Sequence, residues 1–557
     1  MRIYPIWEIV HDGPYQSLVE ALLAGRSFSR EDLAAGPEKL HSPSLLTDLE
    51  AGVERIERAV RQGEKIVVFG DYDVDGVTST ALLLDFLQQV DASCDYILPD
   101  RYRDGYGIKP AGLRRALEKG AQLIVTVDNG IAAFEALEMA QSEGIDVVVV
   151  DHHQQLGELP PAYSIINPNR RDCSYPFKGL AGVGLAFKVV QALSESFMDG
   201  AARRRYLNQL LDLVALGTVA DVAPVMGENR VLVQHGLKML ERTRRPGLRQ
   251  LKSKAGYADK PLNTMAVGFY LGPRINVAGR LEKPDIALDL LRAQHDDEAA
   301  ALADQLNQLN TRRQRLQRQG LKEALHLVDP EDLERDRIII VLGESWHLGV
   351  IGLLASKLAD QYARPAVVCT DDRGDGTYTG SARSIPGYDI STGINACGQY
   401  LTHFGGHAGA GGFSLEADQY EAFRLAFIEH ANAHIADRDM QAKLEVDIML
   451  QPDDIAASTL KELEVLEPFG QGNSVPVFGL RGCRVLERGR IGREGAHLKM
   501  SLGIGQRTCS ALWWNQGAKV DEIDAGQEVT AAFVLEEDSY TGNGAVQMVL
   551  KDLCETI

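Results

Sequence analysis

Acidic and imidazole side chains gather at three places in the first third of the sequence, each directly after a short apolar run. The sequences are GDYDVDG (70–76), TVDNG (126–130) and VVDHH (149–153), and one more acid follows in GTVADVAP (217–224). So many carboxylates cannot all stay ionised in one place without a compensating cation. The groups that could bind such cations or act beside them are Asp71, Asp73, Asp75, Asp128, Asp151, His152, His153 and Asp221.

The most economical arrangement of these ligands is a pair of divalent ions, with one Asp bridging them. A set of mixed carboxylate and imidazole ligands suits Mn²⁺ better than Mg²⁺, which prefers a site made of oxygen ligands alone. A single Asp after a strand is as often a solvated loop residue, but the whole set with its adjacent His pair favours a metal site. A Ca²⁺ loop is excluded, because DYDVDG lacks the bidentate Glu that such a loop needs at position twelve.

The apolar runs before these acids predict the strands of one parallel sheet. They are Ile66–Phe69, Tyr96–Leu98, Leu123–Val127 and Val147–Val150, and they alternate with helical stretches of ten to fifteen residues. In an open parallel sheet, ligands bind outside the carboxyl ends of the strands. We therefore expect the acids to converge at that edge.

The rest of the chain predicts several further domains. The helical stretch 286–328 has almost no Gly or Pro and is longer than ordinary helices, which favours a bridging helix. A strand at Ile338–Leu342 opens a second α/β unit that runs to about Asp437. Residues 438–557 show short alternating stretches between Gly-rich turns, which is typical of a small β-barrel.

Taken together, the motifs GDYDVDG, TVDNG, VVDHH and ALGTVADVAP, in this order, resemble those of the DHH phosphoesterase superfamily. GSARS (380–384) and GGHAGAGG (405–412) resemble its DHHA1 domain. With GPRINVAGRL (272–281) and EPFGQGN…PVF (467–478), nearly the whole chain is similar to the single-stranded-DNA exonucleases of this superfamily. The resemblance implies an arm (1–47), a DHH catalytic domain (48–285), the bridging helix (286–328), a DHHA1 domain (329–437) and an OB-fold that binds nucleic acid (438–557).

The resemblance also implies roles for individual residues. The metal ligands it implies are Asp73, Asp75, Asp128, His152 and Asp221, with Asp128 as the bridge and His153 on the scissile phosphate. Asp151 is expected to orient a metal-ligating imidazole through the other ring nitrogen. Smaller members of the superfamily have a metal-binding His where this chain has Phe69, so Asp71 or water is expected to take its place. The pocket for the DNA 5′ end is implied at Arg101, Arg280, Ser381, Arg383 and His407.

The activity implied is 5′→3′ hydrolysis of single-stranded DNA in repair and recombination. Two ions, Mn²⁺ or Mg²⁺, would activate a bound water as the nucleophile, so no Ser or Cys nucleophile is needed. The partners implied are a single-stranded DNA 5′ end, a single-strand-binding protein and a helicase, and we expect a monomer. Two alternatives stay open: a DHH phosphatase or nanoRNase acting on small nucleotides, and an inactive DHH protein serving as a DNA-binding scaffold.

Composition limits where such a protein works and how it meets DNA. The 557 residues carry 58 Lys and Arg against 78 Asp and Glu, a net charge of −20, so local basic surfaces or metals must overcome long-range repulsion of DNA. Seven Cys without a CxxC pair, no secretory signal and no long apolar run predict a cytoplasmic protein outside the membrane.

A glycine-rich segment and three basic stretches are further candidates for ligand binding. GLAGVGLAFK (179–188) fails both the dinucleotide and the Walker patterns, which favours close packing at a helix start and no ATP requirement. Basic stretches at Arg242–Lys254 and Arg312–Lys322 are read equally as solvated helix faces or DNA contacts. A third, Arg481–Arg507, precedes Trp513 and Trp514 in the expected barrel, and one Trp should be core because strand neighbours face opposite sides.

Overall fold

The computed structural model describes residues 3–34, 36–371, 374–538 and 544–555. The chain forms two compact units. The first unit consists of Glu31–Arg313 and Pro468–Ser474, and the second consists of the residues before Glu31, Gln314–Glu467 and the residues from Val475 onward.

A five-stranded parallel sheet is the centre of the first unit. Its order is β3 (Cys94–Ile97), β2 (Ile66–Phe69), β4 (Leu123–Val127), β5 (Asp146–Val150) and β6 (Ser164–Ile166). The strands β2, β4 and β6 are buried along their whole length, because helices cover both faces of the sheet. The predicted parallel sheet is confirmed, and β6 is an addition to it.

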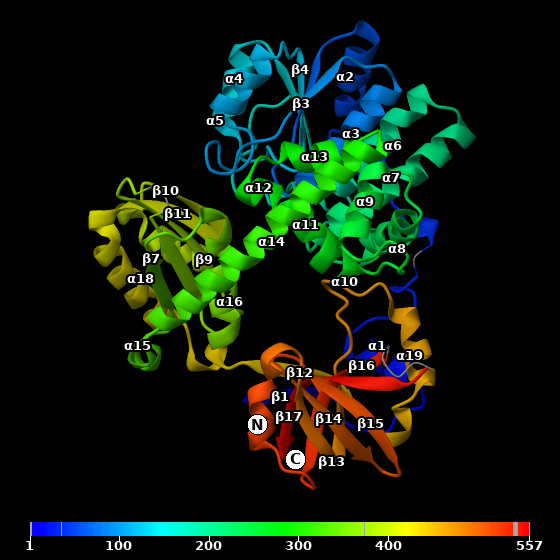
Figure 1. Ribbon diagram of the computed structural model, residues 1–557. Helices are drawn as coiled ribbons and strands as arrows, with labels where there is room; N and C mark the ends of the chain where they lie inside the picture. Colours follow the sequence, from blue (N-terminus) through cyan, green and yellow to red (C-terminus); the bar gives the residue numbers. More distant parts are fainter. Residues whose placement is uncertain (1–2, 35, 372–373, 539–543, 556–557) are drawn as a thin grey trace. The chain divides into compact units, whose positions relative to one another are not determined.

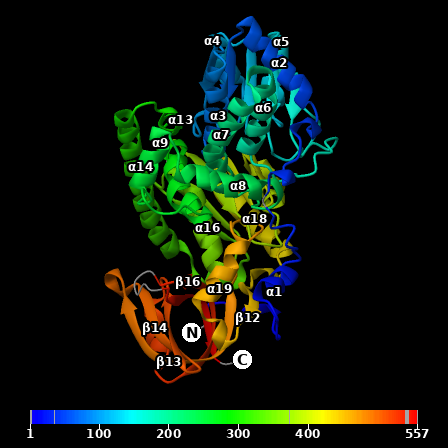
Figure 2. The same ribbon diagram turned by 90° about the vertical axis from the view of Figure 1, so that its right-hand side faces the viewer.

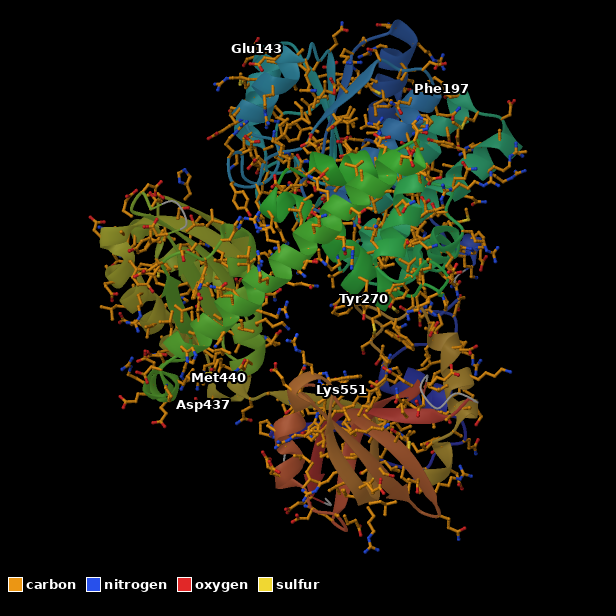
Figure 3. All side chains as sticks on the ribbon, viewed as in Figure 1. Glu143, Phe197, Tyr270, Asp437, Met440 and Lys551 are labelled. Carbon is orange, nitrogen blue, oxygen red and sulfur yellow. The ribbon has the colours of Figure 1, made fainter. Side chains whose placement is uncertain are left out.

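Helices lie on both faces of this sheet (Figure 1). The helices α4 (Pro110–Glu118) and α5 (Phe134–Ser142) pack on one face in a core with β2, β4 and β5. On the other face lie α2 (Leu49–Gln62), α3 (Val74–Gln89) and α6 (Gly182–Phe197). At the end of α6, Phe197 packs edge-on against Phe86 of α3, with ring centroids 6.1 Å apart (Figure 3).

The first unit continues as a helical layer. It contains α7 (Gly200–Ala220), α8 (Gly227–Glu241), α9 (Pro246–Lys254), α10 (Thr264–Ala266), a π-helical turn (Val267–Leu271), α11 (Gly272–Asn276) and α12 (Ala278–Leu281). The segment expected as one helix at 286–328 is two helices, α13 (Asp285–Arg292) and α14 (Asp296–Leu327). Ala293 leaves the helical conformation after α13, with φ −53° and ψ 131°. Asp296, Asp297 and Glu298 then start a new helix, because acids are favourable at the positive end of its dipole.

The second unit contains a mixed five-stranded sheet. Its order is β10 (His403–His407), β11 (Ala410–Glu416), β9 (Thr377–Arg383), β8 (Ala366–Thr370) and β7 (Ile339–Gly343), with only β7 and β8 parallel. One core joins the sheet to α16 (Leu348–Tyr362), and another joins it to α17 (Ile390–Ala396) and α18 (Tyr420–His434). This is the expected second α/β domain.

Five strands near the end of the chain form a closed barrel (Figure 2). They are β13 (Phe478–Ile491), β14 (His497–Ile504), β15 (Arg507–Trp513), β17 (Val546–Glu555) and β16 (Glu528–Glu537), and β16 pairs back with β13. Two stretches were expected as separate strands, 475–480 and 484–488; residues 478–480 of the first and all of the second belong to the long β13, whose register shifts between Leu480 and Cys483. The barrel confirms the expected fold class.

Two further strands extend the barrel sheet. Strand β12 (Lys443–Met449) pairs in parallel with β13, and β1 (Ile6–His11) pairs in parallel with β12. The carboxylate of Asp552 in β17 accepts hydrogen bonds from the amides of Ile3 and Tyr4 and from the indole N–H of Trp7. Part of the segment expected as an arm is therefore an edge strand, followed by α1 (Leu18–Gly25).

Among the described residues, the helices either are too short or carry too many polar side chains to cross a lipid bilayer.

Candidate metal-dependent active site

The first acidic motif forms the turn from β2 into α3. Asp73 is the N-cap of α3, and its Oδ1 accepts a hydrogen bond of 3.1 Å from the amide of Gly76. Asp75, in the first turn of α3, accepts hydrogen bonds from the amides of Gly182 (2.6 Å) and Val183 (2.8 Å). The first two residues of α6 thus fix the Asp75 carboxylate.

Gly182 explains the glycine-rich sequence 179–188. A Cβ at Gly182 would lie 2.8 Å from the Cβ of Asp128 and 3.0 Å from a carboxylate oxygen of Asp75. Only a residue without a side chain fits between these two acids, so the predicted close packing at a helix start is confirmed.

The second and third motifs end the neighbouring strands β4 and β5. Asp128 has a positive φ of 63°, and its amide donates a 2.9 Å hydrogen bond to the carbonyl of Val150. Asp151 accepts hydrogen bonds from the amide of Ile131 (2.9 Å) and from the ring Nδ1 of His153 (2.7 Å). The third strand end thereby orients an imidazole through a buried carboxylate.

His152 points a lone pair at two acids. Its Nδ1 lies 3.1 Å from the carbonyl oxygen of Leu180, which can only accept, so Nδ1 carries the proton. Burial, together with the charge of His153, lowers the pKa of His152 to about 4, so the ring is neutral at pH 7. Its unprotonated Nε2 then lies 3.1 Å from Oδ1 of Asp128 and 3.8 Å from Oδ2 of Asp75.

Several acceptor atoms in this place lack any donor. Within the described part of the chain, no hydrogen-bond partner is found for the buried Nε2 of His152, Oδ1 of Asp128 or either carboxylate oxygen of Asp71. Buried acceptors that face one another are costly unless a cation lies between them. As metal ligands, these carboxylate oxygens and the one imidazole nitrogen form a set that is typical of a divalent metal site.

The same crowding of buried carboxylates raises the pKa values of four of these acids. Burial and the charge of Asp73 raise the pKa of Asp75 to about 7, and burial and Asp75 raise that of Asp221 to about 9. Burial also raises the pKa of Asp71 and of Asp128 well above the usual range, with neighbouring carboxylates adding to it. Each of these groups would ionise readily beside a bound cation.

The acids and imidazoles form three groups of possible ligands. Asp75, His152 and Asp221 bring one ligand atom each within 4.8 Å of one another, and so do Asp71, Asp73 and Asp128. Asp128 also groups with His152 and His153, which places it between the two sets. Phe69, which stands where the resemblance led us to look for a metal-binding His, is fully buried in the sheet core against Gly112.

The first unit also holds two of the arginines expected at the DNA end. The guanidinium of Arg101 lies 5.3 Å from the ring centre of Tyr72, inside the first acidic motif. The hydroxyl of Tyr102 donates to the carbonyl oxygen of Arg280, and Asn276 accepts a 3.2 Å hydrogen bond from the amide of Val74. The GPRINVAGRL segment is thus attached directly to the metal-binding turn.

The other three residues expected at the DNA end lie in the second unit. Arg383 on β9 and His407 on β10 both pair with Ala410 of the strand between them, so they occupy one face of the sheet. The guanidinium of Arg383 donates to the hydroxyl of Ser381 (3.1 Å). That these residues meet Arg101 and Arg280 stays a prediction.

Some basic residues of the stretches considered for DNA binding form ion pairs within the fold. In 242–254, Arg245 pairs with Asp85 and Asp212, and Lys254 pairs with Asp304, which makes part of this stretch internal to the fold. In the barrel, Arg490 pairs with Asp521 and Arg507 lies 3.7 Å from Asp453. Trp513 is buried and Trp514 is 49% exposed, which confirms that one of the two belongs to the core.

Three contributors to the site were missed in the sequence. The amides of Gly182 and Val183 hold Asp75, the side chain of Asn129 bonds the carbonyls of Phe69 and Val127, and Tyr106 contacts both Asp128 and His153. Asn129 directly follows Asp128, and Tyr106 lies in the same PDRYRDGYG segment as Arg101, so proximity in sequence was a usable signal.

Comparison with known proteins agrees with this architecture. Models of the DHH family N-terminal domain, the DHHA1 domain and the RecJ OB domain match residues 65–218, 336–433 and 446–552. The single-stranded-DNA-specific exonuclease RecJ of Escherichia coli is 36% identical, over 96% of this chain and 95% of its own length.

Solved structures extend the match to three dimensions. RecJ from Thermus thermophilus in complex with Mn²⁺ has a TM-score of 0.83 at 30% identity, covering 99% of this chain and 80% of that one. The same protein in complex with Mg²⁺ has a TM-score of 0.77 at 28% identity, with 99% and 79% covered. With the domain order, the acid cluster and the full-length similarity in agreement, this chain belongs to the RecJ family of single-stranded-DNA-specific exonucleases.

Proposed function

We propose that this protein is a 5′→3′ exonuclease that uses two divalent ions, Mn²⁺ or Mg²⁺, to hydrolyse single-stranded DNA. The observation that carries the proposal is the cluster of donor-less acceptors on His152, Asp128 and Asp71, which fits divalent cations and little else. The Mn²⁺ and Mg²⁺ complexes of the Thermus thermophilus relative support this choice of metals.

The ligands divide between two ions in a simple way. Asp75, His152 and Asp221 would hold one, Asp71 and Asp73 the other, and Asp128 would bridge them. When bound, the ions would activate a water for attack on phosphorus and offset the charge that develops on the phosphate. The protein's own part is to keep His152 unprotonated at Nε2, through its hydrogen bond to Leu180, and to fix Asp75 with two amides.

His153 is suited to bind the scissile phosphate. Burial opposes its protonation, but the 2.7 Å hydrogen bond and the charge of Asp151 raise the pKa of His153 to about 9. The ring is therefore an imidazolium at pH 7. Its Nδ1–H donates to Asp151, which leaves Nε2–H to donate to a phosphate oxygen.

The choice of the 5′ end would come from the five residues that resemble the family's terminal pocket, Arg101, Arg280, Ser381, Arg383 and His407. Guanidinium groups bind a terminal phosphate dianion by charge-assisted, bidentate hydrogen bonds. The barrel would hold the strand beyond the site, through its cations and the exposed Trp514. We further propose that the protein acts as a monomer in the cytoplasm, in DNA repair and recombination, beside a single-strand-binding protein and a helicase.

Single-stranded DNA labelled at either end tests the reaction directly. With Mn²⁺ or Mg²⁺, a 5′ label should be released at once as a mononucleotide, while a 3′-labelled strand should shorten step by step. Release of the 3′ label first would refute the polarity, and equal rates on duplex DNA would refute the substrate. Undiminished cleavage in the presence of a chelator would refute the metal requirement.

A further inference from the structure

The loop between β3 and α4, residues 98–109, connects the two parts of the proposed site within the first unit. Its first half carries Arg101, stacked on Tyr72, and Tyr102, bonded to the carbonyl of Arg280. Its second half carries Tyr106, which reaches the ends of β4 and β5. No motif assigned Tyr106 a role, and it is the loop residue that touches both Asp128 and His153.

Tyr106 has one hydroxyl and two partners. The hydroxyl donates a 2.9 Å hydrogen bond to the carbonyl oxygen of Asp128. The same oxygen lies 3.1 Å from both the Nδ1 and the Nε2 of His153, and the two rings meet edge to face with centroids 5.4 Å apart. An oxygen equidistant from the two ring nitrogens lies against the ring and not along either N–H direction, so the Nδ1–H stays on Asp151 and the Nε2–H stays available to a phosphate oxygen.

Both partners need such support. Asp128 holds a φ of 63°, a strained value for a residue with a side chain, and its carbonyl is the group that would turn if the strain were released. His153 is 44% exposed and is held from one side by Asp151. The Tyr106 hydroxyl, 3.1 Å from both ring nitrogens, is a second contact that limits how far the ring can tilt.

The loop is stiff enough to give this support. Asp100 accepts hydrogen bonds from the amides of Tyr102 (2.9 Å) and Arg103 (3.0 Å), and Asp104 accepts one from Arg115 of α4 (2.7 Å). Two residues after Tyr106, the amide of Ile108 donates to the buried Asn129, whose side chain is fixed to the carbonyls of β2 and β4. Hydrogen bonds at both ends of the loop therefore hold the Tyr106 hydroxyl in position.

We propose that Tyr106 is a positioning residue that sets the orientation of His153 toward the scissile phosphate and fixes the main chain of Asp128. The inference rests on the proposed function, since it assigns His153 to the phosphate. It predicts that the hydroxyl contributes to the rate of the chemical step and little to DNA binding or to folding, because the half-exposed ring packs the same way without it.

Tyr106→Phe tests this by removing the hydroxyl alone. We expect kcat on 5′-phosphorylated single strands in Mn²⁺ to fall about 10- to 100-fold, as for other groups that orient a functional imidazole, with KM and the unfolding temperature unchanged. Tyr163→Phe is the matched control, because Tyr163 is 44% exposed and stacks with Arg58 outside the site. An unchanged kcat in Tyr106→Phe, or a loss confined to KM or to stability, would overturn the inference.

A double-mutant cycle tests whether Tyr106 affects the rate through His153 or whether its substitution disturbs the site as a whole. If Tyr106 acts through His153, adding Tyr106→Phe to His153→Ala should cost little further rate in single turnovers with excess enzyme, and the energies of the two changes should not add. Full additivity would overturn the route through His153. Hydrolysis of bis(p-nitrophenyl) phosphate, a phosphodiester without a DNA end, should show the same loss in Tyr106→Phe. A wild-type protein that cleaves this ester but not DNA would refute the proposed function while leaving the role of Tyr106 testable.

Discussion

The unprotonated Nε2 of His152 and the carboxylate Oδ1 of Asp128 lie 3.1 Å apart, and neither has a hydrogen-bond donor within the described residues. When Asp128 is ionised, two acceptors at this distance repel each other, so the contact at the carboxyl edge of the parallel sheet is unfavourable. A divalent ion turns the same contact into a pair of ligands. The site is therefore less stable empty than filled, and this difference can be measured.

Asp128→Asn should abolish turnover without weakening the fold. The amide keeps the shape of the side chain and tolerates the positive φ of this position, but it is a poor bridge between two cations. We expect activity in Mn²⁺ to fall at least about a hundredfold. In a chelator at pH 8 the variant should unfold at a higher temperature than the wild type, because one repelling charge is gone.

Asp91→Asn is the control for this substitution, since Asp91 also has a positive φ, of 55°, and is exposed at the surface. Both its activity and its unfolding temperature should match those of the wild type. An active Asp128→Asn enzyme would contradict the two-metal proposal.

The metal-free protein should lose stability as the pH rises from 7 to 9. Burial and neighbouring acids raise the folded-state pKa of Asp221 to about 9, whereas the unfolded value is near 4. Despite burial, Asp151 raises the pKa of His153 to about 9. In this pH range the folded state holds protons that the unfolded chain has already released. The free energy of unfolding therefore falls as the pH rises, by up to about 1.4 kcal/mol for each such proton and each pH unit.

Thermal unfolding in a chelator, at several pH values between 7 and 9, measures this slope. Asp151 and His152, whose pKa values are lowered to about 2 and about 4, titrate below this window and add nothing to it. Saturating Mn²⁺ should flatten the slope, because metal binding displaces the extra protons. A metal-free stability that rises with pH would contradict the assigned pKa values.

Arg280→Ala and Arg383→Ala should each reduce the preference for 5′-phosphorylated over 5′-hydroxyl strands. A charge-assisted hydrogen bond to a phosphate is worth roughly 1.5–3 kcal/mol, so the ratio of initial rates should fall about tenfold or more. Arg103→Ala is the matched control, because Arg103 is 74% exposed in the same loop as Arg101. If both variants keep the wild-type ratio, the end of the strand is recognised elsewhere.

Trp514→Ala should weaken the binding of long single strands without changing the salt dependence of binding. Stacking of a base on an aromatic ring is worth about 1–3 kcal/mol and releases no counterions. Trp514→Phe should restore most of the affinity, and hydrolysis of very short oligonucleotides should be unaffected in both variants. Equal affinities of Trp514→Ala and the wild type for long strands, in filter binding or anisotropy, would remove Trp514 from the DNA surface.

This point substitution is a cleaner test than removing the barrel by truncation near Asp439. The barrel sheet includes β1, so the truncated chain would expose the edge of that strand and leave Trp7 without the Asp552 carboxylate. A loss of DNA binding in such a truncated protein would then mix two causes.

The sequence predicted the central strands of the first unit's sheet well, because β2, β4 and β5 are apolar runs that come just before the acids of the proposed metal site. Ile66–Phe69 and Leu123–Val127 are the bounds of β2 and β4. The break at Ala293 was missed, because Ala, Gln and His are acceptable within helices and the turn depends on tertiary packing of α13.

The site was predictable where its residues come from strand ends and not where they come from loops. Every acid and imidazole expected as a metal ligand lies in the three groups of possible ligands, since topology brings the strand ends together and Asp221 joins them from the C-terminal end of α7. The amides of Gly182 and Val183 carry no signal of their own in the sequence, because any residue has an amide. Tyr106 was missed because its position depends on the path of a twelve-residue loop.

The pairing of β1 with β12 also determines when this protein can finish folding. Glu8 and Lys443, which form an ion pair across these two strands, are 435 residues apart in the sequence. At about 5–20 residues per second, a ribosome needs roughly 20–90 s to make the chain between them. Throughout that time β1 is synthesised but has no partner strand, and it is an open edge that other chains can pair with. Strand β1 is thus made early and pairs late, and we expect newly made chains to depend on chaperones that bind this strand.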